Sequence, residues 1–302
     1  MKNKIIKAMN LKRIKEKAIY YFFFLTGILA VIILLGIFLM LLLNGLQTFR
    51  DVRFSDFFFG TVWNPSAYGE SSYGILSMIV STFMVTLGAM IIAVPLGIGA
   101  AAYIAEIASQ RTRDILKTIM GILAGIPSVV IGFIGIVLVG PFIARVFGLS
   151  SGLNALNGSI LLAVMSLPTI ISVSEDAIRE VPKEYKEASY ALGANRWMTL
   201  IKVTIPAAYS GIIVSIMLGI GRAIGETMTV LMATGNASAM PHSFFDSVRT
   251  ITATIAIEMG EVPYGTTHYY ALFAVGATLF LISLGVNLIA EIVTSKYRGA
   301  KV

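Results

Sequence analysis

The sequence predicts an all-α integral membrane protein with six transmembrane helices. Hydrophobic residues make up 57% of its 302 residues, and charged residues make up 13%. A soluble domain carries about 25% charged residues, so roughly half of the usual complement is absent. The apolar residues also collect in long runs, with the charges gathered between them. A membrane-spanning helix requires such a run, of about 20 predominantly apolar residues.

The first run, Ala18–Leu43, follows a basic segment at residues 1–17. It is longer than the apolar region of a secretory signal peptide, which has about 7–15 residues, so we expect it to remain as the first span. We expect an outer loop at 44–73, a five-helix core at 74–293 and a short tail at 294–302. The core spans are expected at Gly74–Ile104, Thr118–Phe142, Gly158–Val173, Ala207–Ala233 and Thr267–Val293. Three prolines inside spans predict kinks, because proline removes a backbone donor: Pro95, Pro127 and Pro168.

Lysine and arginine are distributed unevenly around these spans. Most of the 23 basic residues precede the first span, follow the last one, or lie in the loops after the second and fourth spans. The exceptions are Arg50, Arg53, Arg145, Arg222 and Arg249. Loops rich in lysine and arginine remain in the cytoplasm during insertion. Both termini are therefore expected on the cytoplasmic side.

Composition also argues against several classes of function. The chain has no cysteine and only two histidines, His242 and His268, so thiol chemistry and a metal site are not expected. No segment resembles a nucleotide-binding P-loop, so ATP hydrolysis would need another chain. The spans lack clustered nucleophiles or metal ligands, so we do not expect an enzyme. The net charge of +7 lies beside membrane spans, unlike the basic stripe of a nucleic-acid-binding protein.

The loop between the fourth and fifth spans, at about 176–206, carries the most specific pattern. Pro182 suits the start of a short helix, Gly193 suits the left-handed residue that ends it, and Asn195 can cap a second helix. We therefore expect two short helices joined by a glycine turn. The stretch Glu187-Ala188-Ser189, then Gly193, then Val203-Thr204-Ile205-Pro206 resembles the EAA loop of ABC importer permeases.

The resemblance to the EAA loop implies both a fold for this chain and a contact with another subunit. It implies the type I (MetI-like) ABC importer permease architecture, in which this helix fits a groove of an ATPase subunit and transmits its motion. The residues expected at this contact are Glu187, Ala188, Ser189 and Gly193. Small residues permit the close approach that helix-in-groove docking needs. The sequence departs from the family pattern by mild changes at Ser189, Val203 and Ile205.

Further segments resemble the PstC type of permease in phosphate uptake systems. They lie at residues 59–65, 125–130, 219–230 and 254–273. The resemblance implies a subunit of an ATP-driven phosphate importer in the cytoplasmic (inner) membrane of a bacterium or archaeon. It also implies a homologous PstA-like permease, two PstB-like ATPase subunits and an extracytoplasmic PstS-like phosphate-binding protein as partners. ATP and Mg²⁺ would be bound by the ATPase, and this chain would bind no cofactor.

Arg222 and Glu226 are the charged residues expected deepest in the membrane. Arg222 lies about 24 Å beyond Pro206 along an ideal helix, and a charge at that depth needs a partner or a cavity. Glu226 follows by one helical turn and is expected to pair with it. Because guanidinium donates two parallel hydrogen bonds to an oxyanion, we expect Arg222 to contact phosphate, which would displace Glu226. The alternative is a permanent salt bridge that only holds the bundle together. Thr227 and Ser128 offer hydroxyl groups to the same pathway.

Other polar residues have simpler interpretations. Trp63 is expected to anchor the chain at the membrane interface. Glu258 and Glu261 are expected on the outer surface, either in solvent or against a binding protein. Glu106 is expected at the inner interface.

Three alternatives remain open. The chain could be the sister PstA-type subunit, since that subunit shares the arginine–glycine–glutamate core. It could instead carry another oxyanion, such as sulfate or molybdate, because the EAA loop is common to all such permeases. A gradient-driven secondary transporter would lack an explanation for the EAA loop, and the sequence shows no convincing internal repeat.

Overall fold

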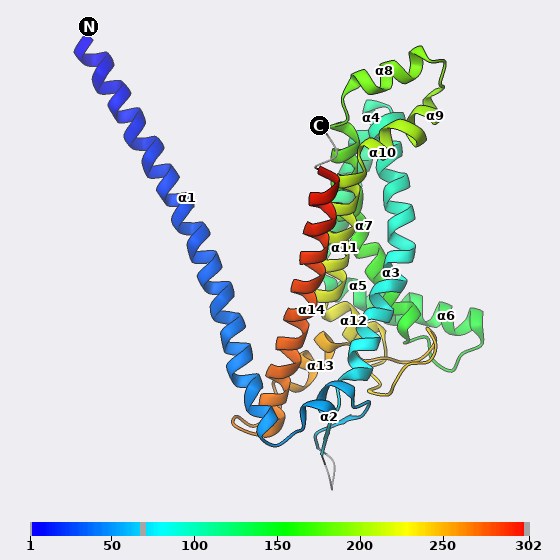
Figure 1. The fold of residues 1–302 in the computed structure, drawn as a ribbon. Helices are drawn as coiled ribbons and strands as arrows, with labels where there is room; N and C mark the ends of the chain where they lie inside the picture. The colour runs from blue at the N-terminus through cyan, green and yellow to red at the C-terminus, as the bar shows by residue number, and fades with distance from the viewer. Residues whose placement is uncertain (1, 67–70, 299–302) are drawn as a thin grey trace.

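Helices form nearly all of the regular structure in the computed structural model, which describes residues 2–66 and 71–298, and the side chains of 16–66 and 71–295. Five helices in this part of the chain are long and apolar enough to cross a membrane, and a bent helix pair supplies a sixth span. The predicted all-α, six-span class is confirmed. Figure 1 shows a helix bundle from which the first helix diverges. We call the end that carries α8 (Lys183–Ala191) the inner end, and the end that carries α13 (Ile251–Glu258) the outer end.

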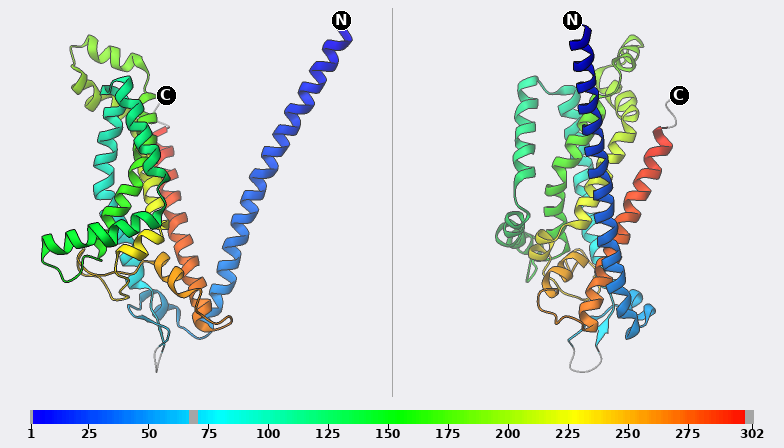
Figure 2. Two further views of the ribbon diagram at one scale, coloured as in Figure 1. Left: turned by 180° about the vertical axis from the view of Figure 1, so that it is seen from behind. Right: turned by 90° about the vertical axis from the view of Figure 1, so that its left-hand side faces the viewer.

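Helix α1 (Lys2–Gly45) contains the first span and diverges from the bundle along most of its length (Figures 1 and 2). Its side chains from Glu16 to Ile37 are all exposed. The helix meets α14 (Thr267–Arg298) toward the outer end, where the rings of Phe38 and Phe280 stack with centroids 4.9 Å apart. An apolar helix surface of this length suits lipid or another membrane helix.

The outer segment that follows α1 is folded rather than extended. It contains η1 (Leu46–Arg50), α2 (Phe54–Phe59) and an antiparallel hairpin of β1 (Trp63–Asn64) and β2 (Ser72–Tyr73). Phe57 and Trp63 pack with residues of α13 and α14 in one buried apolar cluster. The phenylalanine-rich α2 therefore belongs to a buried apolar core at the outer end, in which the segment after α1 packs against α13 and α14.

Helices α3 (Leu76–Ala102) and α11 (Tyr209–Gly225) both pack against α7 (Ala155–Arg179), which lies at the centre of the bundle. Small residues allow the close approach, as expected for membrane helices. Gly219 lies against Ile170, so that an added Cβ atom would be 2.9 Å from its Cδ1. Pro95 and Pro168 lie inside α3 and α7, and both helices continue through them.

Two predicted spans are wrong as continuous helices. The span predicted at Thr118–Phe142 is divided at Pro127, where Ile126 is extended (φ −68°, ψ 126°), because a residue before proline is pushed out of the helical region. The pieces are α4 (Gln110–Gly125), α5 (Ser128–Ile134), the π-turn η3 (Gly135–Val139) and α6 (Gly140–Phe147). The span predicted at Ala207–Ala233 is divided after Gly225, since Glu226 is extended (ψ 134°) and α12 (Met228–Ala233) begins anew.

The inner end carries the predicted pair of short helices. After α8 come α9 (Arg196–Thr199), the π-turn η4 (Leu200–Thr204) and α10 (Ile205–Ala207), and the chain then bends by 70° into α11. Figure 1 shows that α1 begins and α14 ends at this same end of the molecule.

Candidate functional site

The breaks in the third and fifth spans lie side by side. Thr229, at the start of α12, is fully buried, and its hydroxyl donates to the Ser128 carbonyl at 3.1 Å. Gly132 of α5 packs so closely on Met232 that a Cβ atom there would lie 2.9 Å from the Met232 sulfur. The two interrupted helices therefore restart next to each other, and a side chain from one satisfies a carbonyl of the other.

These breaks lie near the middle of the bundle's depth. Along α11, Ser215 meets Ser174 of α7 (Oγ–Oγ 2.6 Å), and Gly219 meets Ile170. The next turn of α11, which carries Arg222, therefore lies level with residues near 167. That position is the midpoint of α7, which runs from 155 to 179. Thr229 also contacts the Met165 sulfur of α7 at 3.1 Å, which places the break at the same level.

Arg222 is exposed on an otherwise apolar face of α11. Leu218, one turn earlier on this face, is 50% exposed, whereas the adjacent Ala223 is buried. Within residues 16–66 and 71–295, no hydrogen bond or ion pair joins Arg222 to another residue. A charged guanidinium at this depth is costly against lipid. This face therefore requires water, an anion or another protein chain.

The expected Arg222–Glu226 pair is wrong for this structure. An i,i+4 pair needs a continuous helix, and α11 ends at Gly225 before Glu226 is reached. The Glu226 carboxylate instead accepts from the Thr229 backbone N–H at 3.4 Å, and the Glu226 carbonyl accepts from the Thr252 hydroxyl at 2.8 Å. The glutamate thus stabilises the break.

The remaining predicted pathway residues lie beside the same break. Ser128 is half-buried and begins α5 directly after Pro127. The half-buried Thr227 immediately precedes α12, and its hydroxyl is 3.4 Å from the Gly225 carbonyl. The structure therefore places all four predicted pathway residues at one depth: Arg222, Glu226, Thr227 and Ser128. Of these, only Arg222 carries a charge without a partner.

The predicted coupling loop has the expected local structure. Gly193 has φ +82°, and the Asn195 side chain accepts from the Met198 backbone N–H at 2.8 Å. Ser189 is partly buried, and its hydroxyl lies 2.9 Å from that of Thr199. Glu187 and Ala188 are exposed, as are the apolar side chains of Leu192 (90%) and Trp197 (63%). The loop therefore presents an apolar surface that this chain does not cover.

The outer end contains a polar cluster that sequence reasoning missed. The Glu258 carboxylate accepts from Trp63 Nε1 at 2.9 Å and from Arg249 at 2.9 Å, and it lies 2.8 Å from His268 Nε2. Trp63 is 3% exposed and the Glu258 side chain 15%, so the predictions of an interfacial anchor and a surface carboxylate are wrong for these residues. Burial would raise the pKa of Glu258, but hydrogen bonds from His268 and Trp63 and the nearby charges lower it overall. Glu261 is exposed as predicted.

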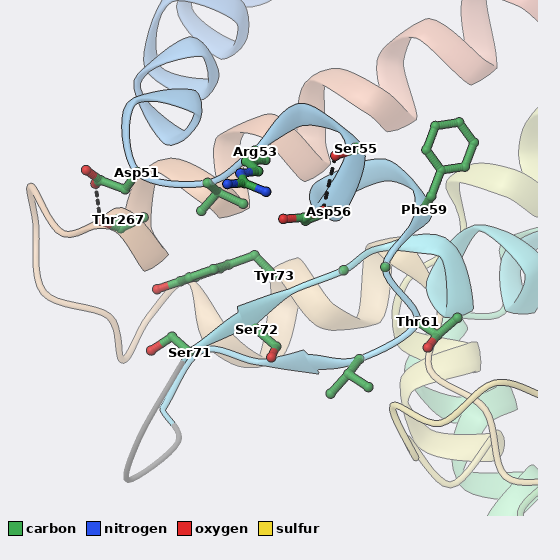
Figure 3. Close-up of a pocket in the computed structure, with 14 residues that line it drawn as sticks. Asp51, Arg53, Ser55, Asp56, Phe59, Thr61, Ser71, Ser72, Tyr73 and Thr267 are labelled. Atoms are coloured by element: carbon green, nitrogen blue, oxygen red, sulfur yellow. Dashed lines mark hydrogen bonds between the residues drawn. The ribbon is translucent and has the colours of Figure 1, made fainter.

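A hollow of about 960 Å³ opens at the outer end, away from Arg222. Figure 3 shows its mixed polar and apolar lining, where Asp51 bonds to Thr267 at 2.6 Å and Arg53 lies beside Asp56. It is wide and open, and nothing in its lining resembles a built anion site. Across the described residues, no group of three or more histidine, cysteine, aspartate or glutamate side chains is arranged to hold a metal ion.

Comparison with known proteins identifies the family. Residues 93–299 match the family described as "Binding-protein-dependent transport system inner membrane component". The "Probable ABC transporter permease protein YqgH" of Bacillus subtilis (strain 168) is 39% identical over 269 residues, covering 88% of this chain and 85% of YqgH. The "Phosphate transport system permease protein PstC 1" of Mycobacterium tuberculosis (strain ATCC 25618 / H37Rv) is 35% identical over 284 residues, covering 82% of this chain and 81% of PstC 1.

A solved structure shares the fold. It is a bacterial ABC transporter involved in the import of the acidic polysaccharide alginate, and one of its chains aligns with a TM-score of 0.62 at 17% identity. The alignment covers 94% of the present chain and 98% of that chain, so the importer-permease fold predicted from the sequence is confirmed. This chain belongs to the family of inner-membrane components of binding-protein-dependent transport systems, as a non-catalytic permease subunit of an ABC importer.

Proposed function

We propose that this permease carries phosphate, and that Arg222 is the residue that holds the anion midway through the membrane. Relatives named as PstC phosphate permeases are 29–35% identical over most of the chain. The observation that carries the proposal is an exposed guanidinium at mid-depth with no partner in the described chain. Arginine suits this role because its planar fork can donate two parallel hydrogen bonds to phosphate oxygens.

The partners follow from the family and from the exposed surfaces. The uncovered apolar surface around Leu192 and Trp197 suits insertion of α8 into a groove of an ATPase, which would bind ATP and Mg²⁺. Two such ATPases, a PstA-like permease and an extracytoplasmic PstS-like phosphate-binding protein complete the proposed importer. The inner end then faces the cytoplasm together with both termini, as the basic residues predict.

Arg222→Ala tests the proposal in the complete complex reconstituted into vesicles, with radioactive phosphate uptake as the readout. Loss of two charge-assisted hydrogen bonds, at about 1.5 kcal/mol or more each, should reduce uptake by about 100-fold or more. Arg222→Lys should recover only part of it, because lysine lacks the bidentate fork. Arg145→Ala, at an exposed arginine of α6, is the matched control and should transport normally.

The same vesicles decide between substrates. Phosphate, sulfate and molybdate are supplied in parallel, each together with the complex's own extracytoplasmic binding protein. Uptake of sulfate or molybdate instead of phosphate would replace the proposed substrate. Normal phosphate uptake by an assembled Arg222→Ala complex would remove Arg222 from the mechanism.

A further inference from the structure

An ion pair at the inner end joins α8 to the membrane helices. Lys186, in the middle of α8, pairs with Glu106, and their side chains are 17% and 20% exposed. Glu106 belongs to the π-turn η2 (Tyr103–Ile107), which ends α3. Side chains this well covered hold a pair more firmly than surface ion pairs do, since less water competes for the charges. The pair is the ionic link between α8 and α3 in the described structure.

The same π-turn is held from the other side by α4. Arg113, in the first turns of α4, donates from Nε to the Ile104 carbonyl at 3.0 Å and from a terminal nitrogen to the Ala105 carbonyl at 3.1 Å. These carbonyls belong to η2, one and two residues before Glu106. The segment η2 therefore contacts both helices. Its Glu106 carboxylate pairs with α8, and its backbone carbonyls accept hydrogen bonds from α4.

A second ion pair holds α4 against α7. Lys117 lies 2.6 Å from Glu175, whose side chain is 2% exposed, and Arg179 contacts the other carboxylate oxygen at 3.2 Å. A buried carboxylate is costly unless it is paired, so Glu175 favours a position of α4 that keeps Lys117 within reach. The inner part of α4 is thus fastened at Arg113 and at Lys117.

Beyond these attachments, toward Pro127, α4 has room to move. None of its residues is buried, and a cavity of about 370 Å³ lies between it and α7, lined by residues that include Gly121, Ala124 and Pro168. In the right-hand view of Figure 2, α4 lies at the edge of the bundle on the inner half. Its outer end is the break at Pro127, and Ser128 beyond it bonds to Thr229 beside the exposed Arg222.

We propose that the Glu106–Lys186 pair is the positioning contact through which movement of α8 reaches α4, and that α4 then opens or closes the helix break beside Arg222. The route runs from Lys186 to Glu106, through η2 to Arg113, and along α4 to Pro127. Glu106 and Lys186 touch no substrate and act only through α4. The inference rests on the proposed docking of α8 on an ATPase, and it holds whichever oxyanion is carried.

Charge exchange tests this link in the assembled complex with its ATPases. The variants are Glu106→Lys, Lys186→Glu and the two combined, with Lys183→Glu as the control at an exposed lysine on the same helix. The chain has no cysteine, so spin labels can be attached at exposed Ile122 of α4 and Leu281 of α14 with cysteine-free partner chains. The distance between the labels is measured without nucleotide and after trapping with ATP and vanadate.

We expect trapping to shift this distance in the wild type, in Lys183→Glu and in the double variant, but not in either single reversal. Phosphate carried per ATP hydrolysed should fall at least about fivefold in the single variants and return to within about twofold in the double variant. Glu106→Gln removes the charge without repulsion and replaces the reversals if these do not assemble.

Two results would overturn the proposal. One is a label distance in Glu106→Lys that shifts on trapping as it does in the wild type. The other is a double variant that carries no more phosphate per ATP than the single variants. The latter result would arise if Lys186 acted by contacting the ATPase directly. If the wild type fails to carry phosphate but the distances behave as expected, the proposed substrate is wrong and the link stands.

Discussion

Replacing Glu258 should loosen the outer end of the protein without unfolding the bundle. The carboxylate is the shared acceptor for Trp63 and Arg249 and lies 2.8 Å from His268. In Glu258→Ala the buried indole N–H and the guanidinium lose this partner. Breaking a buried ion pair costs about 3–5 kcal/mol. Because Arg249 and Glu258 are 21% and 15% exposed, water replaces part of the loss, and we expect about 2–3 kcal/mol.

Hydrogen exchange followed by mass spectrometry measures this loss locally. At about 1.4 kcal/mol per tenfold change, amides of the β1–β2 hairpin and α13 should exchange roughly 30- to 150-fold faster in Glu258→Ala. Peptides from the centre of α7 should be unaffected. Glu261→Ala is the matched control, because Glu261 is an exposed acidic residue three positions away. Unchanged exchange in Glu258→Ala would show that the cluster does not hold the hairpin, and an equal effect in Glu261→Ala would refute the assigned contacts.

The lowered pKa of Glu258 predicts that the stability of the outer end depends on pH. Because its folded pKa lies below the ordinary value of 4.5, the ionised form stabilises the outer end above that pH. This contribution should be lost as the pH falls from 4.5 through the lowered pKa. With Trp197 replaced by phenylalanine, Trp63 is the remaining tryptophan, and its fluorescence should become more accessible to acrylamide over this range. Glu258→Gln should not show that acid transition.

Two further predictions concern packing and docking. Gly152→Ala should lower the unfolding temperature of the purified protein, because its Cβ atom would overlap the Gly140 carbonyl; overpacking of this kind costs about 1–3 kcal/mol. Gly99→Ala, where a Cβ atom meets nothing within 4 Å, should raise or preserve that temperature, and equal behaviour of the two would contradict the predicted clash. Leu192→Asp should reduce co-purification of the ATPase at least about tenfold while leaving helicity unchanged, since Leu192 is 90% exposed. Tyr264→Asp, 81% exposed at the outer end, should retain the ATPase, and retention by Leu192→Asp would exclude this surface from the contact.

The spans and the loop that contains α8 and α9 could be predicted from sequence because their signals are local. Hydropathy identifies α1, α3, α7 and α14, since each is a long apolar run. The left-handed Gly193 and the capping Asn195 form their turn within a few residues of chain. Such features depend on neighbours along the sequence and need little information from the rest of the fold.

The breaks and the polar clusters could not be predicted in the same way. Pro95 and Pro168 lie within continuous helices, whereas the chain at Pro127 breaks, so proline alone does not decide the outcome. After Pro127, the Ser128 carbonyl of the restarted helix accepts a hydrogen bond from Thr229, 101 residues away. Trp63 and Glu258 are separated by 195 positions, and Glu106 and Lys186 by 80. Partners this distant become visible only when the fold is known.

The two helix breaks and Arg222 differ in whether this chain satisfies their polar groups by itself. Backbone groups freed by a break in a membrane must find partners, and here they do: Thr229 bonds to Ser128, and Thr252 bonds to Glu226. These two carbonyls are therefore satisfied within one permease. Arg222 is not, because its charge lies at the same depth on an exposed face with no partner among the described residues. The cost of that charge must be offset from outside the chain, by a second permease that encloses the face, by water, or by the anion that Arg222 is proposed to hold.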